Sequence, residues 1–221
     1  MTKGIFMTGT GTDVGKTFVS SLLLKKMKEE GLNCGYYKPV LSGSDDAELN
    51  DSEYVVKTAG LNTDPKACVT FSYHPALSPH LAAQIENNPV SIEKIKEHFK
   101  TYTCDYLITE GAGGIVCPLN TDKILLKDLI KALNLDVIIV ASAALGTINS
   151  TVLTVEYCKN HGINVKGIIL NRYDKTDIMH RDNKEMIEKL TGIKVIATVE
   201  DKEAKLEMNE FLSLFKEITH E

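Results

Sequence analysis

Glycine, lysine and threonine residues near the N-terminus are spaced in a way that suits phosphate binding. Residues 9–17 read Gly-Thr-Gly-Thr-Asp-Val-Gly-Lys-Thr, between a short apolar run and an apolar helix pattern. A glycine-rich turn before a helix points backbone N–H groups at phosphate oxygens. In such a loop Lys16 reaches the β- and γ-phosphates, and the Thr17 hydroxyl holds Mg²⁺. The spacing is one residue longer than the common G-x-x-x-x-G-K-T pattern, and it predicts a nucleoside-triphosphate site.

A lysine and a glutamate follow two later apolar runs. Lys38 closes the run 34–37, and Glu110 follows the run 106–109 and precedes the glycine-rich residues 111–114. In an open parallel sheet, ligands bind beyond the carboxyl ends of the strands. We therefore expect both side chains at strand ends, on the same edge of the sheet as the phosphate loop.

Carboxylates in the same region predict a metal site. A glutamate before glycines at a strand end is a natural Mg²⁺ ligand, because Mg²⁺ prefers carboxylate and phosphate oxygens. Asp51 could supply a second carboxylate, with Glu53 as its close competitor. Taken alone, both acids are equally typical of a solvated acidic face.

Charge and composition narrow the class of protein. The 221 residues carry a formal net charge of −5, so the chain as a whole offers nucleic acid no basic surface. Arg172 and Arg181 are the only arginines. Lysines, backbone amides and metal must therefore do most of the phosphate binding.

The cysteines and the N-terminus point to a cytoplasmic protein. The five cysteines are scattered and form no C-x-x-C pair, which favours buried thiols in a reducing compartment over disulfides or zinc. The N-terminal apolar run has five residues, which is too short for a signal peptide or a membrane span.

Strand-like and helix-like segments alternate along the chain. Several apolar runs are continuous, as expected for strands covered on both faces. The alternation predicts an α/β fold in one domain, residues 1–221, with a doubly wound, mostly parallel sheet flanked by helices on both faces. Residues 39–89 are less regular and resemble a long insertion. We expect strands at 4–8, 34–37, 106–109, 137–141, 165–170 and 195–199, and helices at 18–30, 53–59, 91–102, 125–133, 148–159 and 182–190.

Taken together, these features resemble the dethiobiotin synthetases, the ATP-dependent ring-closing enzymes of biotin biosynthesis. The matching pieces occur in the family's order and span about residues 5 to 171. The pieces with Lys38 and with residues 146–149 are the more specific, since relatives share the phosphate loop and the Glu110 segment. The matching stretches are 9–17, 37–40 with Ser42 and Gly43, 78–80, 110–114 and 145–149.

The resemblance implies a P-loop NTPase-like fold and a defined reaction. The substrates would be 7,8-diaminopelargonic acid, CO₂ and MgATP. One amine forms a carbamate with CO₂, and the carbamate oxygen attacks the γ-phosphate to give a carbamic–phosphoric anhydride. The second amine then closes the ureido ring and expels phosphate, which gives dethiobiotin, ADP and phosphate. Which amine is carboxylated stays open.

The resemblance also assigns roles to residues of this chain. Lys16, Lys38 and Thr12 would be catalytic, and Thr17, Asp51 and Glu110 would bind Mg²⁺. The diamine or its carbamate would contact Thr12, Lys38, Ser42, Gly111, Gly146, Thr147 and Asn149. ATP would contact Thr12, Asp13, Val14, Gly15, Lys16, Thr17, Phe18, Glu110 and Asn171, with Asn171 at the adenine edge.

The same resemblance implies a homodimer in which the substrate crosses the interface. Its carboxylate would meet the helix start at 146–149 of the other subunit, since helix N-termini bind anions. Neither nucleic acid nor membrane is an expected partner.

Some residues depart from the family pattern. Asp13 stands where glutamate is common, and Ala144 replaces a basic residue. Residues 197–200 lack the usual Gly-x-Ile-Pro, so the base contacts and the nucleotide preference stay open.

Two other classes share parts of the pattern. A nucleotide-switch ATPase of the chromosome-partitioning type usually has a second lysine in its phosphate loop, where this chain has Gly11. A cobyrinate-type amidoligase normally carries a glutaminase domain, for which this chain has no room. The synthetase is therefore the favoured interpretation.

Overall fold

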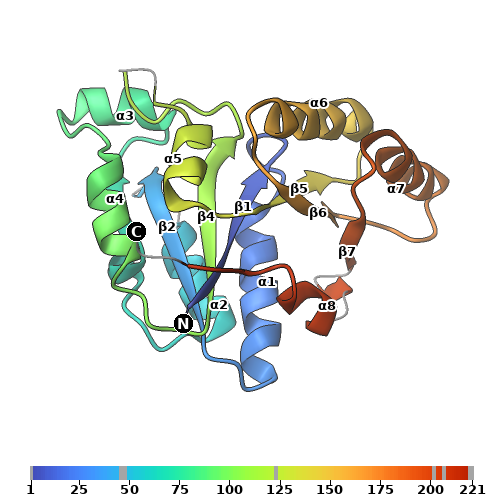
Figure 1. Ribbon diagram of the computed structural model, residues 1–221, viewed down its shortest axis with the longest axis horizontal. Helices are drawn as coiled ribbons and strands as arrows, with labels where there is room; N and C mark the ends of the chain where they lie inside the picture. Colours follow the sequence, from blue (N-terminus) through green and yellow to red (C-terminus); the bar gives the residue numbers. More distant parts are fainter. Residues whose placement is uncertain (1, 45–48, 122–123, 201–202, 206–207, 219–221) are drawn as a thin grey trace.

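The computed structural model describes residues 2–44, 49–121, 124–200, 203–205 and 208–218. Within these ranges nine strands form one sheet in the order β3-β2-β4-β1-β5-β6-β7-β8, and β9 pairs with β1 (Figure 1). All pairings are parallel except those of β8 and β9. The strands are β1 (Lys3–Gly9), β2 (Cys34–Ser42), β3 (Val69–Tyr73), β4 (Tyr106–Gly114), β5 (Val137–Ser142), β6 (Val165–Asn171), β7 (Val195–Glu200), β8 (Glu203–Lys205) and β9 (Lys216–Glu217).

Helices cover both faces of the sheet, as the continuous apolar strands predict. The core on one face includes side chains of α1, α2 and α8. The core on the other face includes side chains of α3 to α7. The doubly wound, mostly parallel α/β fold is therefore confirmed. The helices are α1 (Lys16–Glu29), α2 (Asp51–Ala59), α3 (Pro79–Ile85), α4 (Ile92–Phe99), α5 (Leu126–Leu133), α6 (Thr147–Asn160), α7 (Ile178–Thr191) and α8 (Met208–Leu212), with a 3₁₀ turn η1 (Pro65–Cys68).

The chain changes direction across the sheet at β1. From β1 it runs outward through β2 to β3, returns to β4, and crosses β1 to continue through β5, β6 and β7. Such a switch point is where ligands bind in doubly wound sheets. The phosphate loop follows this central strand, so it lies between the two halves of the sheet (Figure 1).

Strands β2 and β4 are longer than expected, and this corrects the position of two charged residues. Lys38 and Glu110 lie inside β2 and β4 and not at their ends. The β2 strand pairs with β4 through Tyr37 and with β3 from Lys38 onward. Pro39, which lacks an N–H, falls at this change of partner, where the strand tolerates it. Both strands continue past the apolar runs that predict them, β2 to Ser42 and β4 to Gly114.

Two helices begin before the residues that the sequence predicts, because their polar N-cap residues precede the apolar pattern. Helix α2 begins at Asp51 because the Asn50 side chain accepts from the backbone N–H groups of Ser52 and Glu53. Helix α7 begins at Ile178, behind the cap Asp177. The insertion at 39–89 contains α2, η1, β3 and α3, of which only α2 was expected.

In the part of the chain that the structure describes, no helix combines the length and the apolar character needed to cross a bilayer. The five cysteines all lie in this part as free thiols; Cys68 and Cys158 are buried, and the other three are partly buried.

Candidate active site

A cleft of about 930 Å³ lies over the phosphate loop. Its walls come from the loop, α1, β2, the start of α2, the segment before α3 and the end of β4. Elements that are distant in sequence therefore meet at one concave site. The expected site residues that line it are Thr12, Asp13, Gly15, Lys16, Thr17, Phe18, Lys38, Ser42 and Asp51.

The phosphate loop is tied to the end of β6. Gly15 caps α1 with φ of 89°, a left-handed conformation that favours glycine. A Cβ atom at this position would lie 2.1 Å from Asn171 Nδ2, so the site has no room for a side chain. Asn171 Nδ2 donates to the Val14 carbonyl at 3.0 Å, and Arg172 donates to the Asp13 carbonyl at 3.0 Å. Asn171 thus holds the phosphate loop through its bond to Val14. The contact of Asn171 with adenine stays a prediction.

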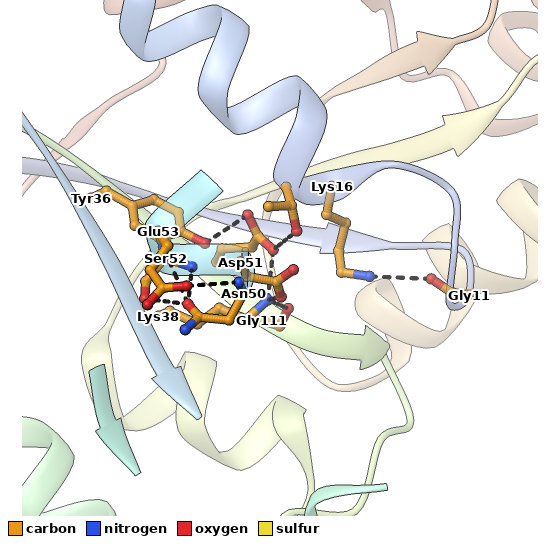
Figure 2. Close-up of polar contacts among 11 residues, drawn as sticks. Gly11, Lys16, Tyr36, Lys38, Asn50, Asp51, Ser52, Glu53 and Gly111 are labelled. Atoms are coloured by element: carbon orange, nitrogen blue, oxygen red, sulfur yellow. Dashed lines mark hydrogen bonds and ion pairs between the residues drawn. The ribbon is translucent and has the colours of Figure 1, made fainter. Parts of the chain in front are cut away.

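Lys16 lies beneath the same loop. Its Nζ donates to the Gly11 carbonyl at 3.3 Å, and its side chain is largely buried (Figure 2). Burial and the nearby Lys38 ammonium lower the pKa of Lys16, while Glu110 and Asp51 oppose that change. An ammonium held in this way has little solvation to lose when a phosphate arrives.

Lys38 is held between two carboxylates, that of Asp51 (Figure 2) and that of Glu110. Its Nζ lies 2.6 Å from Asp51 Oδ2 and 2.6 Å from Glu110 Oε1. Lys38 is 3% exposed and Glu110 is fully buried at 0%, whereas the Asp51 side chain is 39% exposed. Burial alone would lower the pKa of Lys38, but the two carboxylates outweigh it and place the pKa above its ordinary value. Lys38 is therefore a cation throughout the neutral range and not a base.

The register of the sheet explains why Lys38 meets Glu110. Tyr37 on β2 pairs with Thr109 on β4, so the next residues along, Lys38 and Glu110, lie side by side. From Lys38 onward β2 pairs with β3, and the Lys38 ammonium lies 2.6 Å from Glu110 Oε1. Asp51 reaches the same point from the first turn of α2. Partial burial alone would raise the pKa of Asp51, but the neighbouring Lys38 ammonium outweighs it and lowers that pKa.

Glu110 connects this cluster to the phosphate loop. Its Oε1 accepts from Thr17 Oγ1 at 2.9 Å as well as from Lys38, and its Oε2 accepts from the Tyr36 hydroxyl at 3.1 Å. Burial and the Glu110 charge raise the pKa of Tyr36, so this hydroxyl remains a donor. Thr17, Asp51 and Glu110 thus lie in one cluster and all three present oxygen atoms, while their binding of a metal stays a prediction.

The structure separates the two competing acids of α2. Asp51 faces Lys38, whereas Glu53 accepts from the backbone N–H of Asn50 at 3.0 Å. Glu53 therefore completes a capping box, which is a structural role at the helix start. The roles of Asp51 and Glu53 differ because α2 begins at Asp51, two residues before the expected start. The sequence alone does not give this boundary.

Several expected residues lie outside the described lining of the cleft. Gly111 is inside β4, where its carbonyl lies 3.5 Å from Lys38 Nζ. Gly146, Thr147 and Asn149 form the start of α6, and Gly146 caps that helix with φ of 92°. The cleft brings together the lysines and the metal-ligand candidates, but it does not include the start of α6. Val14, Glu110 and Asn171 support the cleft from behind its surface.

Some residues of the site were missed by reasoning from the sequence. Ser78 and Pro79 begin α3 and line the cleft. Residues 78–80 belong to a stretch that matches the family, but the sequence assigns them no role. Tyr54 on α2 and Cys117 after β4 also line it, and neither stands out in the sequence. Tyr36 looks like an ordinary strand residue until its hydroxyl is seen on Glu110.

Comparisons with known proteins show which family the amino-acid sequence resembles. Residues 3–207 match the protein family described as an AAA domain. The chain is 49% identical to "ATP-dependent dethiobiotin synthetase BioD" of Brachyspira hyodysenteriae, over 98% of this chain and 100% of that protein. It is 48% identical to the protein of the same name from Clostridium perfringens, over 95% of this chain and 96% of that one.

A likeness to a solved structure concerns the fold alone. The ParA family ATPase from Chlorobium tepidum TLS superposes with a TM-score of 0.54 at 16% sequence identity, covering 90% of this chain and 83% of that one. At this identity the likeness supports the α/β architecture and says nothing about the reaction.

Proposed function

The chain belongs to the family of ATP-dependent dethiobiotin synthetases, ligases of biotin biosynthesis, and from this premise we propose how its cleft performs the reaction. The substrates are 7,8-diaminopelargonic acid, CO₂ and ATP, and the products are dethiobiotin, ADP and phosphate. The observation that carries the proposal is Lys38, held as a buried cation between Asp51 and Glu110 and facing the cleft beside Lys16.

The reaction needs cations more than it needs acid–base groups. An amine attacks CO₂ and loses a proton, which gives a carbamate. The carbamate oxygen attacks the γ-phosphorus, ADP leaves, and a carbamic–phosphoric anhydride forms. The second amine attacks the carbamate carbon and expels phosphate. The first two partners that must meet, carbamate and γ-phosphate, are both anions, so positive charge has to hold them together.

Lys16 and Lys38 supply that charge in this proposal. Lys16 lies under the loop that would cradle the phosphates, and Lys38 opens onto the same cleft from β2. Lys38 would bridge the carbamate and the γ-phosphate, where charge shifts in the transition state. Thr12 and Ser42, which line the cleft, would bind the carbamate or the diamine. The Gly111 carbonyl would help to hold Lys38 in place.

We propose that Thr17, Asp51 and Glu110 hold Mg²⁺. The donor set fits this ion, since it offers two carboxylates and a hydroxyl, with phosphate oxygens to complete the ligands. When bound, Mg²⁺ would neutralise charge that develops on the transferred phosphate.

The loop residues Asp13, Val14, Gly15 and Phe18 would surround the nucleotide, and Asn171 would contact the adenine edge from the end of β6. In the region where the family has Gly-x-Ile-Pro, this chain has β7, which pairs antiparallel with β8. We propose that residues 1–221 act as one ligase domain in the cytoplasm.

We also propose a homodimer with shared sites. The start of α6, with Gly146, Thr147 and Asn149, would bind the substrate carboxylate for the other subunit. Leu145 is 87% exposed and Leu153 is 61% exposed, and both lie on the segment that the partner would cover. Leu145 precedes the cap of α6 and Leu153 lies within that helix, and exposed leucines there are consistent with a protein interface.

The test is phosphate release with ATP, Mg²⁺ and bicarbonate, with and without the diamine. We expect release only when diamine and bicarbonate are both present, together with dethiobiotin by mass spectrometry. Diamine-independent hydrolysis that DNA stimulates would contradict the proposal and favour a nucleotide-switch ATPase.

A further inference from the structure

The Tyr36 hydroxyl donates to Glu110 Oε2 at 3.1 Å, and both groups are buried. Tyr36 pairs with Ile108 on β4, two residues before Glu110. Its ring packs in the core between the sheet and helices α1 and α2. None of the reaction steps described above uses this hydroxyl, although Figure 2 shows it at the edge of the charged cluster.

The two oxygens of Glu110 have different partners. Oε1 accepts from Thr17 at 2.9 Å and from Lys38 at 2.6 Å, on the side of the cleft. Oε2 accepts from Tyr36, on the side of the core. Because Glu110 is 0% exposed, removing the hydroxyl leaves Oε2 without its donor in a buried position. A carboxylate that is held at only one oxygen can rotate about its terminal torsion.

We propose that Tyr36 is a positioning residue, whose hydroxyl fixes the Glu110 carboxylate so that Oε1 is presented to Thr17, Lys38 and the metal. The metal part of this inference rests on the proposed function. Outer-shell partners that orient a ligating carboxylate commonly change metal affinity by about 10- to 100-fold. The hydroxyl of Tyr36 therefore acts through Glu110 and does not itself touch a substrate.

Tyr36→Phe is the direct test, because it keeps the ring and removes only the hydroxyl. The next residue offers a matched control. Tyr37 lies on the same strand, is equally buried, and bonds through its hydroxyl to Thr70 Oγ1 at 2.6 Å and to the Ile95 carbonyl at 3.2 Å. Its ring faces the opposite side of the sheet, since side chains alternate along a strand. Tyr37→Phe thus removes a buried hydroxyl that does not contact Glu110.

The readout is Mn²⁺ binding in the presence of a non-hydrolysable ATP analogue, measured by electron paramagnetic resonance, so that no turnover is needed. We expect Tyr36→Phe to raise the Mn²⁺ Kd by about tenfold, and Tyr37→Phe to leave it within about twofold. Turnover should fall in Tyr36→Phe while the KM for ATP stays close to that of the wild type. Urea unfolding of the two variants checks that both fold.

Glu110→Gln and the double variant Tyr36→Phe/Glu110→Gln complete the test. If Tyr36 acts through Glu110, the double variant should bind Mn²⁺ within about twofold of Glu110→Gln alone. An undiminished effect of Tyr36→Phe in the Glu110→Gln background would overturn the inference, as would equal losses in Tyr36→Phe and Tyr37→Phe. If Glu110→Gln weakens Mn²⁺ binding and Tyr36→Phe does not, the inference fails while the proposed function stands. If neither variant changes it, the proposed metal site fails as well.

Discussion

The cluster around Lys38 and the start of α6 differ in how completely one chain builds them. Lys38 is surrounded by Asp51, Glu110 and the Gly111 carbonyl, and every one of these contacts comes from the same subunit. The start of α6 presents Gly146 at its cap and Leu145 at 87% exposure, and it lies outside the cleft.

The two regions differ in how far the fold itself must satisfy their polar groups. Buried charges are costly unless they are paired, so the Lys38 cluster must be built fully by the fold itself. A helix start in solvent needs no such partners, because water satisfies its N–H groups. In the proposed function, the first region therefore assembles the phosphate chemistry within one chain, whereas the second would become a site only when a partner subunit and the substrate carboxylate meet it.

Lys38→Met should produce the largest loss of activity. Without the ammonium, the carbamate and the γ-phosphate repel each other, and we expect kcat to fall by roughly 100-fold or more while ATP binding changes less. Steady-state phosphate release and equilibrium ATP binding measure the two effects. Near-normal turnover would show that Lys38 is only a structural partner of the two acids.

The same variant should also be unstable, because it leaves Glu110 buried without its cation. Losing one partner of a buried ion pair costs about 3–5 kcal/mol in the free energy of unfolding. Lys38→Met/Glu110→Gln should recover much of this stability in urea unfolding but none of the activity. Recovery of both would mean that the charges serve stability alone.

Glu110→Gln should raise the Mg²⁺ requirement by about tenfold or more, because an amide oxygen is a weaker ligand than a carboxylate. Titration of the rate with Mg²⁺ at saturating ATP measures the change. Asp51→Asn should have a similar effect, and Glu53→Gln should not. A high Mg²⁺ requirement in Glu53→Gln and a normal one in Asp51→Asn would reverse the proposed ligands.

Mixed dimers test whether the start of α6 belongs to the partner's site. We combine Lys16→Ala subunits with Asn149→Ala subunits, each nearly inactive alone. If sites are shared across a two-fold interface, one of two sites is intact in each mixed dimer, and random mixing should recover about a quarter of the wild-type activity. If Lys16 and Asn149 serve one site within a single subunit, mixing recovers no activity. The proposal that the start of α6 serves the partner's site would then be wrong.

Glu53→Gln should have the smallest effect. Glutamine keeps an acceptor for the Asn50 N–H but loses its charge near the helix N-terminus, which costs about 0.3–1 kcal/mol of stability. Urea unfolding should show this small loss, with turnover unchanged. A loss of turnover would place Glu53 in the charged cluster instead of in the cap.

Local chemistry made part of this molecule predictable from its sequence. The phosphate loop was predicted because the loop conformation depends on neighbouring residues, such as a glycine at a left-handed position before a helix. The existence of six strands and six helices followed from periodic apolar runs. Strands and helices within 60–89 were missed because Val69–Tyr73 and Pro79–Ile85 are short and lie among prolines.

The sequence by itself determined which chemical groups the protein possesses: a phosphate loop, two lysines and several acids near the ends of apolar runs. Only the tertiary structure decided which of these groups meet. Asp51 and Glu53 are equivalent in sequence, and the first turn of α2 points one at Lys38 and the other at its own N-terminus. Tyr36 gained a role because the register of β2 on β4 places its hydroxyl on Glu110, 74 positions away. Contacts of this kind depend on the pairing of distant strands, which local patterns do not encode.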